Sequence, residues 1–158
     1  MSWLAQLISA GLLCATFATF PPIATADAVD EDPDLAKRDE DYAAGNGAVE
    51  RKDWSQAVRL FQRAEVRNPD NADLQNVLGY CYRNLKQYDL AFTHYKRAIQ
   101  LDPRHRGAHE YIGEAYLLTA DLANAEKHLA ALRDICVLPC EELKDLERAV
   151  AEYRARKK

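Results

Sequence analysis

Two cysteines near the end of the chain are the residues whose type and spacing most readily suggest chemistry. Cys136 and Cys140 flank the residues VLP, and Pro139 favours a turn that would bring their sulfur atoms within bonding distance. In an oxidising compartment we expect the two to form a structural disulfide. As thiolates they could instead carry copper(I) or exchange thiols, because soft sulfur ligands suit that metal. No third ligand lies nearby in the sequence, so the disulfide is the prediction and the copper or thiol carrier is the alternative.

Histidine and glutamate pairs one helical turn apart form the second group of candidates. His105 and His109 have a spacing that can hold a metal ion, but the intervening RGA lacks the acidic residue of a metalloprotease motif. Glu110 and Glu114 have the same spacing, which a charged helix face explains without catalysis. The sequence also contains no glycine-rich phosphate loop and no nucleophile elbow. We therefore predict that the protein is not an enzyme and needs no metal or cofactor.

The elements that must position these residues repeat along the chain with a period of 34 residues. Small residues recur at that interval, namely Gly45, Gly79 and Gly113, and Ala57, Ala91 and Ala125. Within each period the apolar residues follow the spacing of two successive helices separated by a short polar turn. The pattern predicts helices at 38–52, 54–67, 72–85, 88–101, 106–119 and 122–134. Cys81 lies on one of these apolar faces and is expected to be a small buried hydrophobe.

This period and pattern resemble the tetratricopeptide repeat family from Arg38 to Val137. The middle unit carries the family's signature residues, which are Leu78, Gly79, Tyr82, Ala91, Tyr95, Ala98 and Pro103. The outer units match less well, as expected for repeats with one face toward solvent. The resemblance implies an all-α fold, a right-handed superhelix of three helix-turn-helix hairpins at 38–71, 72–105 and 106–137. It also relates the chain to small exported bacterial proteins of that family.

A further helix is predicted within 138–158, after the repeats. From Glu141 onward the apolar residues recur every three or four positions, at Leu143, Leu146, Val150 and Tyr153. Such a stripe is typical of a helix with one buried face. We predict that this segment caps the third hairpin, where a disulfide would fasten it.

By the same resemblance, the first helix of each hairpin lines a concave groove that binds a peptide or protein. The residues predicted to contact the partner are Tyr42, Asn46, Asn76, Tyr80, Arg83, Glu110 and Glu114. Chaperone-binding members of the family hold C-terminal carboxylates with two Lys, two Asn and one Arg. Those positions are occupied here by Tyr42, Asn46, Val77, Gly107 and Tyr111, and of these only Asn46 matches. The resemblance thus implies a non-catalytic scaffold or adaptor without this carboxylate grip. A purely structural module that self-associates is the alternative.

The start of the chain has the pattern of an export signal. The run LAQLISAGLLCATFATF at 4–20 is uncharged and mainly apolar, and it is followed by two prolines and by the small residues ATA before Asp27. This predicts a signal peptide over 1–26 that is cleaved after Ala26, with an uncleaved membrane anchor as the alternative. The expected location is the periplasm or the outside of the cell.

Charge is concentrated directly after this segment. Residues 27–41 contain eight acidic and two basic residues, and 27–37 is predicted to be a flexible acidic arm. The whole chain has a net charge of −4. This balance gives no electrostatic reason to bind nucleic acid, and we expect no membrane association once the signal is removed.

Overall fold

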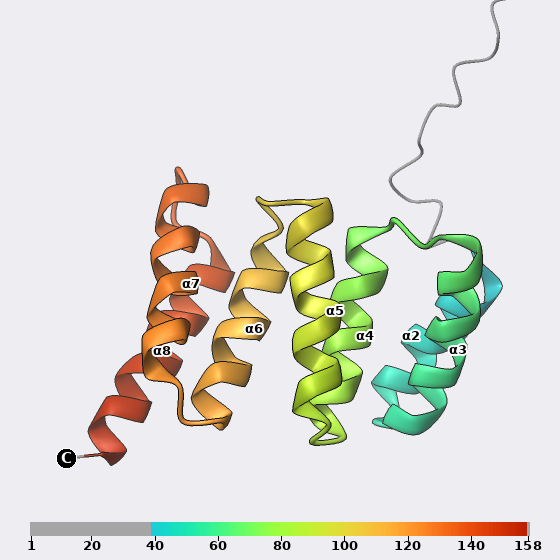
Figure 1. Cartoon of the computed structure of the whole chain (residues 1–158), viewed down its shortest axis with the longest axis horizontal. Helices are drawn as coiled ribbons and strands as arrows, with labels where there is room; N and C mark the ends of the chain where they lie inside the picture. Colours follow the sequence, from blue (N-terminus) through green and yellow to red (C-terminus); the bar gives the residue numbers. More distant parts are fainter. Residues whose placement is uncertain (1–38, 158) are drawn as a thin grey trace, which may run out of the picture. The chain divides into compact units, whose positions relative to one another are not determined.

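The structure is a computed structural model in which residues 39–157 are described. Over that range the chain forms seven α-helices and no strand (Figure 1). They are α2 (Glu40–Glu50), α3 (Trp54–Arg67), α4 (Ala72–Asn84), α5 (Tyr88–Leu101), α6 (Arg106–Leu118), α7 (Leu122–Ile135) and α8 (Glu141–Arg156). Consecutive helices pack as the pairs α2–α3, α4–α5 and α6–α7, and α8 packs against α6 and α7. The predicted all-helical fold with three hairpins is confirmed.

The turn inside each hairpin has the same backbone design. Lys52, Lys86 and Ala120 adopt a left-handed conformation with φ of 58°, 61° and 63°. The residue after each one donates a backbone hydrogen bond to a carbonyl five residues earlier, as Gln87 N does to Tyr82 O at 2.9 Å. This is the Schellman ending of a helix, which here turns the chain back into the second helix of the pair.

Side-chain caps begin most of these helices. At the start of α3 and α7, the carboxylates of Asp53 and Asp121 each accept a hydrogen bond at 3.1 Å from the backbone N–H three residues on. Gln87 occupies the same register before α5, but its side chain makes no capping bond. At the first helices of the hairpins, Asp39, Asn71 and His105 act as caps. Asp39 therefore starts α2 at Glu40, two residues later than the periodicity predicts.

The repeated glycines allow close helix packing, although the third does so differently. A Cβ atom on Gly45 would lie 2.5 Å from the ring of Phe61, and one on Gly79 would lie 2.6 Å from the ring of Tyr95. Both rings belong to the second helix of the same hairpin. A Cβ atom on Gly113 would instead lie 2.7 Å from Leu146 of α8. The space beside the third glycine is thus filled by the last helix.

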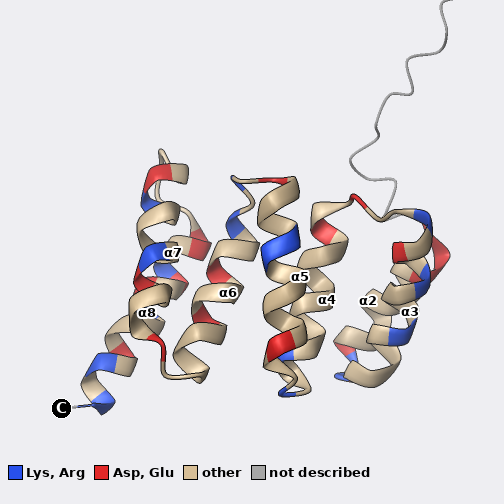
Figure 2. Ribbon diagram, in the orientation of Figure 1, with Lys and Arg blue, Asp and Glu red and all other residues tan. Residues whose placement is uncertain are grey.

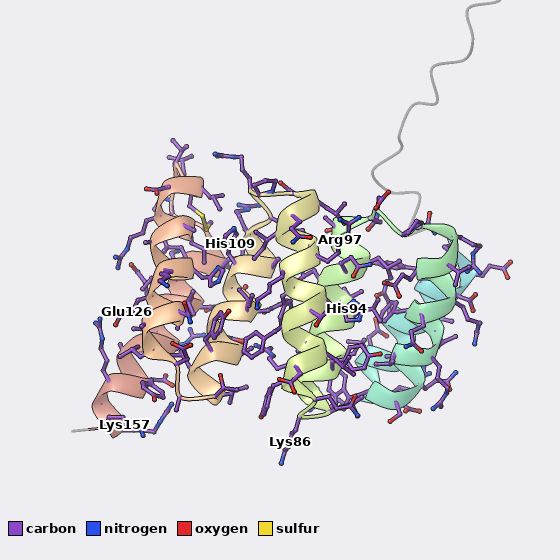
Figure 3. All side chains as sticks on the ribbon, viewed as in Figure 1. Lys86, His94, Arg97, His109, Glu126 and Lys157 are labelled. Carbon is purple, nitrogen blue, oxygen red and sulfur yellow. A yellow bond between two sulfur atoms is a disulfide. The ribbon has the colours of Figure 1, made fainter. Side chains whose placement is uncertain are left out.

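The last helix joins the stack through apolar packing and a covalent bond. Leu146 and Val150 are buried in a cluster shared with α6 and α7, which includes Leu129. Cys136, at the end of α7, forms the predicted disulfide with Cys140, the residue before α8 (Figure 3). Both sulfur atoms are therefore occupied, which leaves no thiolate for the copper alternative in this state.

The leader at 1–26 and the acidic arm at 27–37 lie outside the described residues. Within 39–157 no helix is long and apolar enough to cross a membrane.

Candidate partner-binding groove

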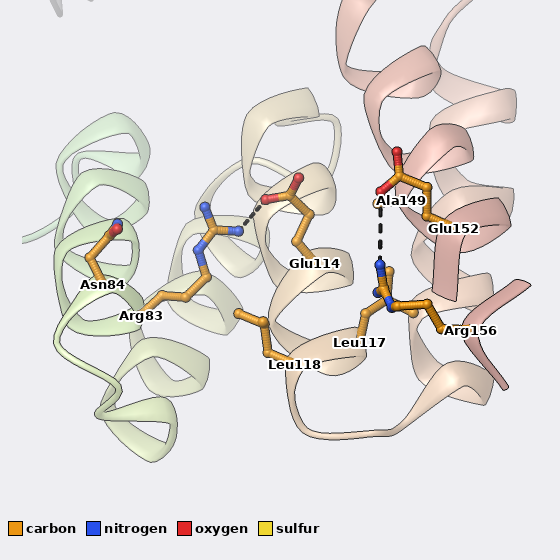
Figure 4. A pocket seen from close by; sticks show the side chains of 8 residues that line it. All are labelled: Arg83, Asn84, Glu114, Leu117, Leu118, Ala149, Glu152 and Arg156. Carbon is orange, nitrogen blue, oxygen red and sulfur yellow. Dashed lines mark hydrogen bonds and ion pairs between the residues drawn. The ribbon is translucent and has the colours of Figure 1, made fainter. Parts of the chain in front are cut away.

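Arg83 on α4 lies at the centre of the predicted contact residues. Its guanidinium carbon is 5.2 Å from the ring centre of Tyr80 and 5.1 Å from that of Tyr111 on α6. The same guanidinium donates a hydrogen bond to the carboxylate of Glu114 (Figure 4). Only 11% of the Arg83 side chain is exposed. Because two rings and a carboxylate hold it, Arg83 is a fixed part of the groove wall rather than a mobile surface charge.

Aromatic rings extend this wall across three helices. Tyr80 lies 5.2 Å from Tyr111, and Trp54 of α3 meets the Tyr80 ring edge-on at 5.6 Å. Behind them, Tyr95 of α5 is fully buried and lies 6.4 Å from Tyr111, while its hydroxyl has no hydrogen-bond partner within the described range. Burial raises the pKa of Tyr95, so the hydroxyl stays protonated at any physiological pH. Trp54 was not among the predicted contact residues because its contact depends on how neighbouring hairpins stack.

A cleft of about 350 Å³ opens beside Arg83 between α4, α6 and α8 (Figure 4). It is lined by Arg83, Asn84, Glu114, Leu117, Leu118, Ala149, Glu152 and Arg156. Leu118 is 60% exposed, and Arg156 lies 3.9 Å from Glu152. The cleft therefore combines an apolar floor with charges that are already paired.

The contribution of α8 to this cleft was missed in the sequence. Ala149, Glu152 and Arg156 recur every three or four residues beside the apolar stripe of α8, a spacing that places them on one helix face. The spacing alone places these residues on one face of α8, but it indicates a cleft only once α8 is known to lie alongside α6. The structure thus adds a third helix to the two that carry the central residues.

Glu110 and Asn76 lie deeper in the groove wall. Glu110 is 8% exposed, and within residues 39–157 its carboxylate receives no hydrogen bond. Burial raises the pKa of the Glu110 carboxyl to about 7, and the carboxylates of Glu114, Asp145 and Glu142 add to that rise.

On α4, Asn76 is 7% exposed and its Oδ1 atom has no hydrogen-bond donor among residues 39–157. A Cβ atom on Gly107 of α6 would lie 3.2 Å from its amide nitrogen, so this side chain faces the wall that carries Glu110. The wall thus contains one buried amide oxygen and one mostly buried carboxylate without a donor in this part of the chain.

The remaining predicted residues, Tyr42 and Asn46, do not join this group. Tyr42 is 4% exposed and packs on Phe61 with ring centres 5.4 Å apart, so it belongs to the core of the first hairpin. Asn46 is exposed on α2. The described groove is therefore concentrated on the second and third hairpins and α8.

The two histidines that had metal-binding spacing have separate structural roles. His105 caps α6, with its Nδ1 atom accepting a hydrogen bond from Ala108 N at 3.1 Å. His109, labelled in Figure 3, instead pairs with His128 of α7, their Nδ1 atoms 3.0 Å apart. No group of three or more His, Cys, Asp or Glu residues in the described part of the chain could hold a metal ion.

Comparison with known proteins agrees with this architecture. Residues 42–104 match the tetratricopeptide repeat family. The segment 42–104 thus has the sequence pattern of tetratricopeptide repeats. Heat shock protein STI1 of Saccharomyces cerevisiae is 31% identical over 91 residues, which are 57% of this chain and 15% of the relative. Small glutamine-rich tetratricopeptide repeat-containing protein 2 of Mycosarcoma maydis is 30% identical over 84 residues, which are 53% of this chain and 24% of the relative. The chain thus spans at most about a quarter of either protein.

Solved structures with this fold include complexes with peptides. The type III secretion translocator chaperone SycD of Yersinia enterocolitica has a TM-score of 0.68 and 20% identity, covering 79% of this chain and 96% of SycD. SycD bound to a peptide of the translocator YopD has a TM-score of 0.67 and 20% identity, covering 77% of this chain and 95% of that one. The TPR2B domain of yeast Sti1 bound to an Hsp70 peptide has a TM-score of 0.68 and 19% identity, covering 77% of this chain and 97% of the domain. At these identities the likeness establishes a shared tetratricopeptide superhelix.

Proposed function

We propose that this protein is a non-catalytic adaptor that holds an extended peptide segment of a partner protein in the groove formed by α4, α6 and α8. The observation that carries the proposal is the fixed Arg83, whose guanidinium contacts the rings of both Tyr80 and Tyr111 beside an open cleft. Aromatic and arginine side chains that are held in place before binding supply contact area at low entropic cost. The YopD and Hsp70 peptide complexes with the same fold give further support.

The groove chemistry argues against recognition of a C-terminal carboxylate. Of the five positions that would hold such a group, only Asn46 has the residue that a carboxylate grip requires, and it lies on the first hairpin away from the cleft. The cation of Arg83 is already paired with Glu114. We therefore expect an internal segment of the partner to bind, with its main chain extended along α6.

A matched pair of charge substitutions tests the groove. Twelve-residue peptides are first selected from a random displayed library on the folded protein, and their affinity is measured by fluorescence anisotropy. Leu118→Glu places a charge in the cleft and is expected to weaken binding about tenfold or more. Val66→Glu places the same charge on another exposed apolar site, on α3 and 82% exposed, and is expected to leave binding unchanged. Failure to select any peptide, or equal losses in both variants, would contradict the proposal.

We also propose that the protein works in the cell envelope after export. The apolar leader supports this, and so does the disulfide, because such bonds persist in oxidising compartments. Mass spectrometry of the protein purified from its native cells is expected to find an N-terminus at Asp27. A full-length chain in the membrane fraction would instead favour the uncleaved anchor.

A further inference from the structure

Two mostly buried side chains in the groove wall, Glu110 and Asn76, lack a hydrogen-bond donor among the described residues. Each residue is more than nine-tenths buried. The Oδ1 atom of Asn76 is itself buried without a partner in residues 39–157, and the Glu110 carboxylate receives no hydrogen bond there. An unpaired buried acceptor loses its hydration without compensation, which costs stability. A ligand that brings donors to this point would recover that cost on binding.

The charges around Glu110 show what kind of donor is missing. Each acidic neighbour of Glu110 has a cation next to it. Glu114 pairs with Arg83, and Glu142 lies 3.7 Å from Arg106. Asp145 likewise accepts a hydrogen bond of 2.7 Å from Arg148. Glu110 alone among these carboxylates forms no ion pair in the described residues, because Arg83, the nearby cation that acts on it, is paired with Glu114. Figure 2 shows acidic residues on both α6 and α8, the two helices that face each other here.

We infer that the groove selects partner segments with a lysine or arginine side chain, which ion-pairs with Glu110 and donates a hydrogen bond to Asn76. This inference rests on the proposed peptide-binding function and specifies its ligand. A cation matches both groups, because a carboxylate and an amide oxygen are hydrogen-bond acceptors and an ammonium or guanidinium group has several N–H donors to share between them. The raised pKa of Glu110 agrees with this, since burial and three neighbouring carboxylates make the group harder to ionise and a bound cation would oppose both effects.

The position of the cleft adds a second element to the recognised segment. Leu117 and Leu118 follow Glu110 by about two turns on α6, which is roughly 11 Å along the helix. An extended peptide covers that distance in about three or four residues. The segment should therefore carry an apolar residue three or four positions from its basic residue, with the apolar side chain on the cleft floor.

Selection of peptides on two forms of the protein tests this inference. A random twelve-residue library is selected on the wild-type chain and on Glu110→Gln, which removes the charge and keeps the shape. We expect wild type to enrich one Lys or Arg at a fixed distance from an apolar residue. That enrichment should disappear for Glu110→Gln, and a wild-type peptide should bind this variant about tenfold or more weakly. Glu50→Gln, on the exposed end of α2, is the matched control and should behave as wild type.

The outcomes separate this inference from the proposed function. Selected peptides that bind at the cleft but carry no enriched cation would overturn the inference and leave peptide binding intact. Absence of any selected peptide would overturn both. Because Glu110→Gln removes an unpaired buried charge, it is expected to fold at least as stably as wild type, and thermal unfolding verifies this.

Proton release gives an independent measurement on the same complex. A bound cation must lower the pKa of Glu110, whose other charged neighbours are Glu114 on α6, Glu142 and Asp145 on α8, and Arg83 on α4. Calorimetric titration at pH 7 in two buffers of different ionisation enthalpy should therefore give different heats for wild type. The heats should converge for Glu110→Gln.

Discussion

At the scale of single residues, the pairing of His109 and His128 makes the third hairpin sensitive to pH. The Nε2 atom of His109 lies 3.2 Å from Pro103 O and must carry a proton to donate there. In a neutral ring the Nδ1 atom of His109 then accepts, and His128 donates to it across 3.0 Å. His128 also stacks on Tyr116 with ring centres 5.7 Å apart. His109 must therefore be neutral for this bond to form, whereas burial disfavours a charge on His128.

This arrangement predicts acid sensitivity with a definite sign. Burial, followed by the neighbouring His109, lowers the pKa of His128 to about 4. The folded protein then binds fewer protons than the unfolded chain, so the contribution to stability is complete above about pH 6.5 and decreases as the pH falls toward 4. His128→Gln, which can still donate to His109, should reduce the loss of unfolding free energy between pH 7.5 and 5 by about 1 kcal/mol.

Comparison with wild type isolates this effect from groups that titrate in the same range. Glu110 has a raised pKa and acts in the opposite direction, because it stabilises the folded state as it gains its proton. It is present in both proteins and cancels in the difference. Urea unfolding at several pH values measures the slope, and identical slopes for the two proteins would contradict the histidine pairing.

At the scale of helices, the three repeats differ most at one cap. Asp53, Gln87 and Asp121 have nearly the same backbone conformation, with ψ of 73°, 68° and 73°. Only Gln87 fails to bond to the first turn that follows it. Among the second helices of the three hairpins, α5 is thus the one whose first turn receives no side-chain cap.

Gln87→Asp should therefore stabilise the protein. The shorter carboxylate can reach the backbone N–H of Leu90, as Asp121 reaches Asn124, and it also favours the positive end of the helix dipole. We expect the free energy of unfolding to rise by about 0.5–1.5 kcal/mol. Asp121→Ala should lower it and serves as the reverse control. If Asp121→Ala is destabilising but Gln87→Asp brings no gain, the equivalence of these turns is wrong.

Most of the helical architecture could be predicted from the sequence, because the 34-residue period reflects interactions within single hairpins. The apolar spacing, the small residues at Gly79 and Ala91, and the turn residues each act within one hairpin. The predicted α3 span agrees with the structure at both ends, and Lys52 ends the first helix because its left-handed backbone breaks the pattern.

The groove was less predictable because it depends on contacts between hairpins. The repeat pattern predicts that Tyr42 and Tyr80 both face the groove, yet Tyr42 is buried on Phe61 and Tyr80 lines the wall. Likewise, nothing near His109 in the sequence indicates that His128 is its partner, 19 residues away. Such pairs are fixed by how helices stack, which periodicity alone does not determine.

At the scale of the whole stack, α8 substitutes for a fourth repeat. Leu146 fills the space next to Gly113, where the first two hairpins use Phe61 and Tyr95 of their own second helices. The corresponding residue of α7, Leu129, is shorter than either ring and is buried in the cluster with Leu146. The last helix is therefore part of the core and also forms one side of the cleft.

A double-mutant cycle tests this role of α8. Gly113→Ala should destabilise the wild-type chain, because the new methyl group meets Leu146, and it should be tolerated when Leu146→Ala is also present. We expect a coupling of about 1 kcal/mol or more. Gly79→Ala is the matched control, since it meets Tyr95 and its cost should add to that of Leu146→Ala. Additive costs for Gly113 as well would show that α8 does not pack there.

The stacked and paired state of Arg83 also bears on how fast a partner can bind. Its side chain loses rotational freedom during folding, so a ligand arriving later meets a rigid wall and does not have to order it. Encounter rates should then be governed by diffusion and by long-range attraction between unlike charges, and they should decrease as ionic strength rises. Lifetimes of the complex, which depend on short-range contacts, should respond to salt much less.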